Sequence, residues 1–156
     1  MSAVSPEFYT NLGKTGLKIS RIVVGCMSFG KKSWSDWVIE DKEKVFAILK
    51  KCYDNGLRTF DTADVYSNGY SEVLLAEFIK KYNIKRDKIV ILTKLFFPID
   101  TDIPDFTPAK VATMPACEYI NSRGLSRKHI MDAAKASNER LGTYADVIQI
   151  HRFDPT

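Results

Sequence analysis

Segments with the pattern of short buried strands alternate with amphipathic helical segments along the 156-residue chain, and this alternation restricts the fold more than any other feature. The first strand segment, residues 22–25, is an apolar β-branched run without the polar alternation of a half-exposed strand. Further strand segments follow at residues 57–60, 89–92 and 147–150. Strands of this kind, separated by helices, predict right-handed βαβ units and a parallel sheet.

Amphipathic helices are predicted in the connections between these strands. Residues 40–55 place apolar side chains at helical spacing and are followed by Gly56, a common helix stop. A second helix begins near Ser71, and a third follows Ser126, whose hydroxyl is suited to cap it. The predicted inner faces comprise Val45, Ile48, Leu49, Cys52 and Tyr53 in the first helix, Leu75, Phe78, Ile79 and Tyr82 in the second, and Ile130, Ala133, Ala134, Ser137 and Leu141 in the third.

Other segments lie outside this alternation. Residues 8–20 alternate apolar and polar side chains around Gly13 and Gly16, which predicts a short hairpin that plugs one end of the sheet. Residues 1–7 are predicted to be a flexible N-terminus. Residues 95–125 are rich in proline and lack a sustained period, so we expect an irregular insertion of the length that often forms functional lids.

Composition excludes several classes of function. The formal net charge of +4 comes from 23 basic and 19 acidic residues that are interleaved along the chain, which argues against nucleic-acid binding. The 3 cysteines lack the CxxC spacing of zinc sites, so we expect reduced thiols and no metal centre. No stretch approaches ~18 consecutive apolar residues, and the N-terminus lacks the pattern of a secretion signal. We therefore expect a cytoplasmic protein without a membrane partner.

Polar side chains of complementary chemistry follow the later predicted strands. Asp61 and Tyr66 come after the second strand, Lys94 after the third, and His151 after the fourth. The carboxyl ends of parallel strands lie at one edge of the sheet, where active sites form in folds of this class. We therefore expect these side chains to converge on one site.

A Tyr, a Lys, an Asp and a His together suit the reduction of a carbonyl group. A phenol with a reference pKa of ~10 is a poor acid until a nearby ammonium favours phenolate. We hypothesise that Lys94 has this effect on Tyr66, while an ion pair with Asp61 keeps the ammonium charged. Tyr66 would then protonate the carbonyl oxygen as hydride reaches the carbon, a step often worth ~10²–10⁴ in rate, while His151 holds that oxygen.

Each of these residues also has a purely structural interpretation. Asp61 opens an Asp-Thr-Ala-Asp sequence that is typical of helix caps and Asx turns. On spacing alone, a tyrosine at the position of Tyr66 is more often a packing or interface aromatic, and a histidine like His151 is more often a hydrogen-bonded structural residue at a strand end. Only the combination of the side chains favours catalysis.

Longer stretches carry a further signal: residues 9–20, the sequence Phe-Asp-Thr-Ala-Asp-Val-Tyr at 60–66, Thr93-Lys94, and residues 123–130. Together they resemble the aldo-keto reductase superfamily, from about residue 8 to 155. The resemblance is closest to the fungal aryl-alcohol dehydrogenase-like branch. The potassium-channel β subunits are also similar but usually lack a histidine at the place of His151, which favours the reductase branch.

This resemblance implies an α/β fold that is the N-terminal half of a (β/α)8 TIM barrel, with about four parallel strands and three helices preceded by a short β-hairpin. Residues 8–156 would form this partial domain, because a complete barrel needs ~250 residues. The chain stops soon after its fourth strand, so we expect it to be truncated, with open strand edges that favour self-association.

The resemblance also implies a function, which is NADP(H)-dependent reduction of aldehyde or ketone carbonyls to alcohols. The implied catalytic residues are Tyr66 as the proton donor, Lys94 and Asp61 as its partners, and His151 as the residue that orients the substrate. Cys26, Met27 and Asp61 would touch the nicotinamide.

Other interpretations stay open at this stage. One is a non-catalytic nucleotide-binding subunit similar to the potassium-channel β subunits, and another is an inactive truncated remnant. A self-contained flavodoxin-like domain ranks last, because it would need a finishing helix and a phosphate loop at the first strand.

Overall fold

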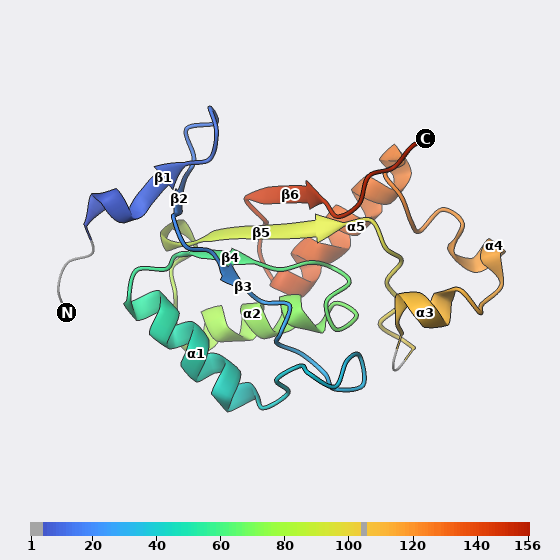
Figure 1. The fold of residues 1–156 in the computed structure, drawn as a ribbon, viewed down its shortest axis with the longest axis horizontal. Helices are drawn as coiled ribbons and strands as arrows, with labels where there is room; N and C mark the ends of the chain where they lie inside the picture. Colours follow the sequence, from blue (N-terminus) through green and yellow to red (C-terminus); the bar gives the residue numbers. More distant parts are fainter. Residues whose placement is uncertain (1–4, 104–105) are drawn as a thin grey trace.

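A computed structural model describes residues 5–103 and 106–156 of the chain. A four-stranded parallel sheet forms its centre in the order β3-β4-β5-β6, as predicted (Figure 1). The strands are β3 (Val24–Gly25), β4 (Thr59–Asp61), β5 (Val90–Leu95) and β6 (Val147–Ile150). The register pairs Gly25 with Asp61 and Lys94 with Gln149, so the carboxyl ends of all the strands meet at one edge.

Three longer helices cover one face of this sheet: α1 (Lys42–Asp54), α2 (Tyr70–Lys81) and α5 (Arg127–Leu141). Phe60 of β4 and Ile91 of β5 are fully buried beneath them, each with an exposed fraction of 0%. The core that they form with the helices comprises Val24, Cys26, Phe29, Val45, Phe46, Leu49, Phe60, Leu74, Leu75, Phe78, Ile84, Ile89, Ile91 and Leu141. This layered α/β arrangement is the predicted half of a barrel.

The inner faces of all three helices differ in part from the predicted ones. In α2, Ser71, Glu72 and Leu74 are buried in addition to Leu75 and Phe78, whereas Ile79 is only half-buried. In α1, Phe46 is buried in addition to Val45 and Leu49. In α5, His129 is buried, whereas Ile130 is only half-buried. Periodicity weights apolar side chains alone, so a histidine on the inner face is read as polar and assigned to solvent.

The predicted N-terminal hairpin consists of β1 (Tyr9–Asn11) and β2 (Lys18–Ser20), paired antiparallel. Gly13 and Gly16 have φ values of 57° and 79°, the left-handed backbone expected at the turn. The Ser20 N–H donates to Thr59 Oγ1 at 2.9 Å, which fixes the hairpin to the amino end of β4. Residues 1–4 of the predicted flexible N-terminus lie outside the described residues, and the short helix η1 (Pro6–Phe8) follows them.

The insertion after β5 contains two short helices, α3 (Pro108–Val111) and α4 (Ala116–Tyr119), where the sequence predicts an irregular loop. Single helical turns are too short to show a period, which is why the pattern did not reveal them. Residues 104–105 of this insertion lie outside the described residues. Another short helix, η2 (Arg86–Lys88), precedes β5. Among the described helices, none combines the length and the apolar character needed to cross a bilayer.

The predicted cap of α5 is present, because Ser126 Oγ accepts a hydrogen bond from the His129 N–H at 3.2 Å. We expect Ser126→Ala to lower the free energy of unfolding by about 1 kcal/mol, the usual effect of losing such a cap. Urea denaturation measures this change. The control is Lys135→Ala on the exposed face of α5, which should change stability by less than about 0.5 kcal/mol. Equal effects of the two substitutions would show that the cap contributes nothing specific.

The sheet is covered unevenly at its last strand. Ile148 and Ile150 of β6 point to the helix-covered side, yet their exposed fractions are 44% and 64%. β3 and β6 are the outer strands of the sheet, so each has one edge without a strand partner among the described residues. Such open edges and exposed apolar side chains favour association with another surface.

Candidate active site

Lys94 lies at the centre of the predicted site and contacts two of its other members. Its Nζ donates to Asp61 Oδ2 at 2.6 Å and to Tyr66 Oη at 3.0 Å. A third hydrogen bond goes to the Thr62 carbonyl at 2.9 Å, so the three N–H donors of the ammonium have acceptors. The structure therefore brings together Asp61, Tyr66 and Lys94 as the sequence predicts.

Local backbone structure sets these positions. Asp61 is the last residue of β4 and Lys94 lies inside β5, one strand over, where alternation places both side chains on the face opposite the helices. Tyr66 returns over this face because the chain turns sharply between β4 and α2. The Asp61 carboxylate binds the side chains of Lys94 and Gln149, so it is neither a helix cap nor an Asx turn.

Gln149 is a further residue of the site, which the sequence patterns do not predict. Its Nε2 donates to Asp61 Oδ1 at 2.8 Å, while Lys94 binds the other oxygen of the same carboxylate. Gln149 lies beside Lys94 in the register of β5 and β6, two residues before His151. The available signal was this alternation along β6, which places Gln149 and His151 on one face.

His151 approaches Tyr66 through ring packing. The two rings lie edge to face with centroids 5.6 Å apart, and the Phe97 ring also packs edge to face against the imidazole, with centroids 5.3 Å apart. His151 Nδ1 is buried and has no hydrogen-bond partner among the described residues. The Trp34 ring also meets Tyr66, with centroids 6.4 Å apart. Trp34, Tyr66, His151 and Phe97 thus form a continuous series of ring contacts, which we call the aromatic wall.

The site controls the charges of its basic groups. Burial acts to lower the pKa of Lys94, but hydrogen bonds to Asp61 and Tyr66 outweigh it, so the pKa is raised and the ammonium persists. Burial lowers the pKa of His151, and the charges of Lys94 and Arg152 lower it further. At neutral pH the imidazole is therefore neutral, with one nitrogen available to donate and the other to accept.

The residues predicted to touch a nicotinamide lie in different environments. Met27 has an exposed fraction of 43% and lies two residues after Gly25, the β3 residue that pairs with Asp61. The Cys26 side chain is 2% exposed and belongs to the core, and burial raises the pKa of its thiol to about 12. A cofactor at this edge would meet the Met27 side chain, whereas it could meet Cys26 only through the backbone.

A second group of ionisable side chains lies buried beside the site. Glu72 is fully buried, accepts from Thr93 Oγ1 at 2.6 Å and pairs with Arg140 Nε at 2.6 Å. Asp64 is also fully buried, and neither of its carboxylate oxygens has a hydrogen-bond partner among the described residues. Burial, assisted by the charge of Glu72, raises the pKa of Asp64 to about 8.

Asp64 should make stability fall as the pH rises. Between its ordinary pKa of 3.8 and about 8, the unfolded chain loses the Asp64 proton while the folded protein keeps it. We expect the free energy of unfolding of Asp64→Asn, compared with that of the wild type, to increase by on the order of 2 kcal/mol as the pH rises from about 5 to about 8. Denaturation at both pH values measures this. An identical pH dependence in both proteins would contradict it, and Asp132→Asn on the exposed face of α5 is the control.

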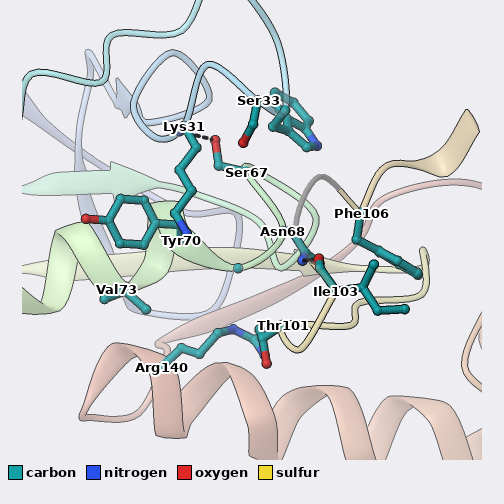
Figure 2. A pocket seen from close by; sticks show the side chains of 12 residues that line it. Lys31, Ser33, Ser67, Asn68, Tyr70, Val73, Thr101, Ile103, Phe106 and Arg140 are labelled. Atoms are coloured by element: carbon teal, nitrogen blue, oxygen red, sulfur yellow. Dashed lines mark hydrogen bonds between the residues drawn. The ribbon is translucent and has the colours of Figure 1, made fainter. Parts of the chain in front are cut away.

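A cavity of about 450 Å³ lies next to the loop that follows Tyr66 (Figure 2). Its lining includes Trp34, Asn68 and Arg140, but it includes none of Asp61, Tyr66, Lys94 and His151. The cavity is therefore separate from the chemical groups of the site, although Trp34 is common to its lining and to the aromatic wall.

Known proteins share both the sequence and the fold. The sequence model of the Aldo/keto reductase family matches residues 21–156. A Schizosaccharomyces pombe protein whose name describes a candidate aryl-alcohol dehydrogenase is 54% identical over 99% of this chain and 46% of its own length. The versiconal hemiacetal acetate reductase of Aspergillus parasiticus is 45% identical over 94% of this chain and 42% of its own length.

The chain thus spans about half the length of the curated relatives it matches. Among solved structures, a thermostable aldo-keto reductase crystallised with the inhibitor epalrestat superposes with a TM-score of 0.68 at 24% identity, covering 94% of this chain and 43% of that protein. At this identity the likeness concerns the fold, and it agrees with half of a barrel. Because this family model covers most of the chain, the chain belongs to the aldo/keto reductase family.

Proposed function

We propose that the protein is an oxidoreductase that reduces aldehyde or ketone carbonyls to alcohols with NADP(H), with Asp61, Tyr66, Lys94 and His151 as its catalytic residues. The observation that carries this proposal is that the Lys94 ammonium binds the Tyr66 hydroxyl and the Asp61 carboxylate at once. A structural lysine would need only the carboxylate. A contact to a phenol oxygen at the open edge of the sheet suits proton transfer.

Proton transfer from Tyr66 follows from this geometry. As a carbonyl oxygen gains negative charge, the Tyr66 hydroxyl gives it a proton and becomes phenolate. Lys94 Nζ, 3.0 Å from Tyr66 Oη, stabilises the charge that forms there. Asp61 holds the ammonium in place, and Gln149 holds the other oxygen of Asp61.

His151 orients the carbonyl group in this proposal. Its imidazole is neutral at neutral pH, so it donates a hydrogen bond to the carbonyl oxygen without supplying a competing proton. Phe97 and Tyr66 pack against the ring and limit its rotation.

The described residues fit the nicotinamide end of a cofactor. The fit rests on the exposed Met27 side chain, which follows β3 at the same edge of the sheet as Asp61 and the hydrogen-bonded Lys94–Tyr66 pair. When bound, the nicotinamide supplies the hydride that reaches the carbonyl carbon. The residues of this chain place the acceptor oxygen and deliver the proton.

Titration of the purified chain with NADPH tests this function, followed by addition of benzaldehyde and measurement of nicotinamide oxidation. Saturable binding with turnover supports the proposal. Binding without turnover favours the alternative, a non-catalytic nucleotide-binding subunit. Absence of both would favour an inactive remnant and overturn the proposal for this chain.

We further propose that the chain associates with itself through the open edges of β3 and β6, and that the exposed Ile148 and Ile150 of β6 contribute to this contact. Light scattering during the same titration measures the association state. Ile150→Lys should shift the population toward monomer, because a charge on the exposed face of an outer strand opposes pairing. A monomeric wild-type chain would contradict this.

A further inference from the structure

The turn that follows Tyr66 has an unusual backbone. Ser67, Asn68 and Gly69 have consecutive left-handed φ values of 50°, 53° and 87°. This conformation disfavours most L-residues, so a run of three persists only where the surroundings hold it. The Lys31 N–H donates to Ser67 Oγ at 3.0 Å, and Arg140 lies so close to Gly69 that a Cβ there would be 2.7 Å from Arg140 Cδ.

Asn68 uses both ends of its side-chain amide to hold a distant segment. Its Nδ2 donates to the Asp100 carbonyl at 2.6 Å and to the Ile103 carbonyl at 3.5 Å. Its Oδ1 accepts from the Asp100 N–H at 3.2 Å. Figure 2 shows the Asn68 side chain directed at the chain that carries Ile103. The turn beside the proton donor is thereby joined to the start of the insertion.

The segment held in this way carries part of the wall of the site. The Phe97 ring packs on the His151 imidazole at 5.3 Å. Ile99, next to Asp100, packs against the small buried cluster that contains Tyr66. Displacement of Asp100 would therefore move side chains that pack against Tyr66 and His151.

We propose that Asn68 is a positioning residue that anchors residues 97–103 to the turn after Tyr66 and thereby sets the fit of the carbonyl substrate against Phe97 and Ile99. Asn suits this position because it tolerates left-handed backbone and offers a donor and an acceptor on one short side chain. Gly keeps the backbone but loses the anchor. The role in substrate fit rests on the proposed function, whereas the anchor does not.

Amide hydrogen exchange of Asn68→Gly tests the anchor without any need for activity. We expect the Asp100 amide to exchange about tenfold faster relative to the Ile91 amide of β5, because its acceptor is lost. Dividing the exchange rate of the Asp100 amide by that of the Ile91 amide corrects for a change in global stability. An unchanged ratio would show that Asn68 does not anchor residues 97–103.

The matched control is Asn83→Gly. Asn83 is also left-handed, with a φ of 47°, and its side chain makes no hydrogen bond within the described part of the chain. Both substitutions place Gly where Asn held a positive φ, but only Asn68→Gly removes an anchor. The Asp100 ratio should therefore stay at its wild-type value in Asn83→Gly, and an equal rise in both variants would assign the effect to the backbone and overturn the proposal.

Two measurements test whether Asn68 sets the positions of Phe97 and Ile99 beside the substrate. The His151 imidazole signal in NMR should shift in Asn68→Gly, because the ring current of Phe97 changes when its segment moves. With benzaldehyde as substrate, KM should rise about tenfold while kcat changes less than about threefold, as expected for lost substrate fit with intact chemistry. An unchanged His151 signal, or an unchanged KM in an active enzyme, would contradict the role of Asn68 in positioning Phe97 and Ile99. A wild type without turnover would overturn the proposed function alone, and exchange and NMR would still decide the role of Asn68.

Discussion

Replacing Tyr66 by Phe should reduce carbonyl reduction by about 10²–10⁴-fold, because the proton donor is lost while the ring is kept. The ring contacts with Trp34 and His151 do not involve the hydroxyl, so the aromatic wall should persist. Lys94 retains Asp61 and the Thr62 carbonyl as acceptors, so the ion pair should also persist. Single-turnover measurement of hydride transfer with NADPH and an aldehyde checks this.

Two controls make the Tyr66→Phe result specific. NADPH affinity should stay within about twofold of the wild type, because the hydroxyl acts on the carbonyl and not on the cofactor. Tyr70→Phe, at the start of α2, removes a hydroxyl that the described site does not use and should leave the rate unchanged. An unchanged hydride-transfer rate in Tyr66→Phe would remove the chemical basis of the proposed mechanism.

Replacing Arg140 by Met should destabilise the fold by about 3–5 kcal/mol, because it strands a fully buried carboxylate. Glu72 is 0% exposed, and Arg140 is its ionic partner at 2.6 Å. The remaining hydrogen bond from Thr93 cannot compensate a negative charge inside the core. The nearby Asp64 carboxyl does not compensate either, because neither of its oxygens hydrogen-bonds to another described residue, and its ionised form would repel Glu72. Chemical denaturation measures the loss.

A charge-neutralising double variant separates the buried charge from side-chain packing. Glu72→Gln combined with Arg140→Met should recover part of the stability, because no unpaired charge remains in the core. Lys128→Met breaks an exposed pair with Asp132, whose side chains are 66% and 63% exposed, and serves as the surface control. Its effect should stay below about 1 kcal/mol. A loss in Arg140→Met no larger than in this control would show that the buried Glu72 carboxylate does not depend on its ion pair.

The sequence predicts those parts of the fold that depend on local patterns. Apolar periodicity identified α1 and α2, and a hydroxyl at the right position identified the start of α5 at Ser126. The parallel order of the strands followed from their alternation with helices. The short helices α3 and α4 were missed, because a single turn leaves no periodic signal.

The residues of the site also fall into those that the sequence predicts and those that it does not. Asp61, Tyr66 and Lys94 could be predicted to converge, because strand ends of a parallel sheet share one edge. Gln149 and Asn68 escaped prediction, since an amide in a strand or turn usually faces water. Their roles depend on partners 88 and 32 residues away, and no local pattern encodes such a distance.

The order of the strands in the sheet is the same as their order along the chain, and this has a consequence for folding kinetics. Each strand can pair with the one that precedes it, so the sheet grows by addition at one edge without waiting for a distant segment. The entropy lost in each pairing is that of one connecting segment. We therefore expect Tyr66 and Lys94 to meet early in refolding, as soon as β5 adds to β4, with His151 joining when β6 pairs last.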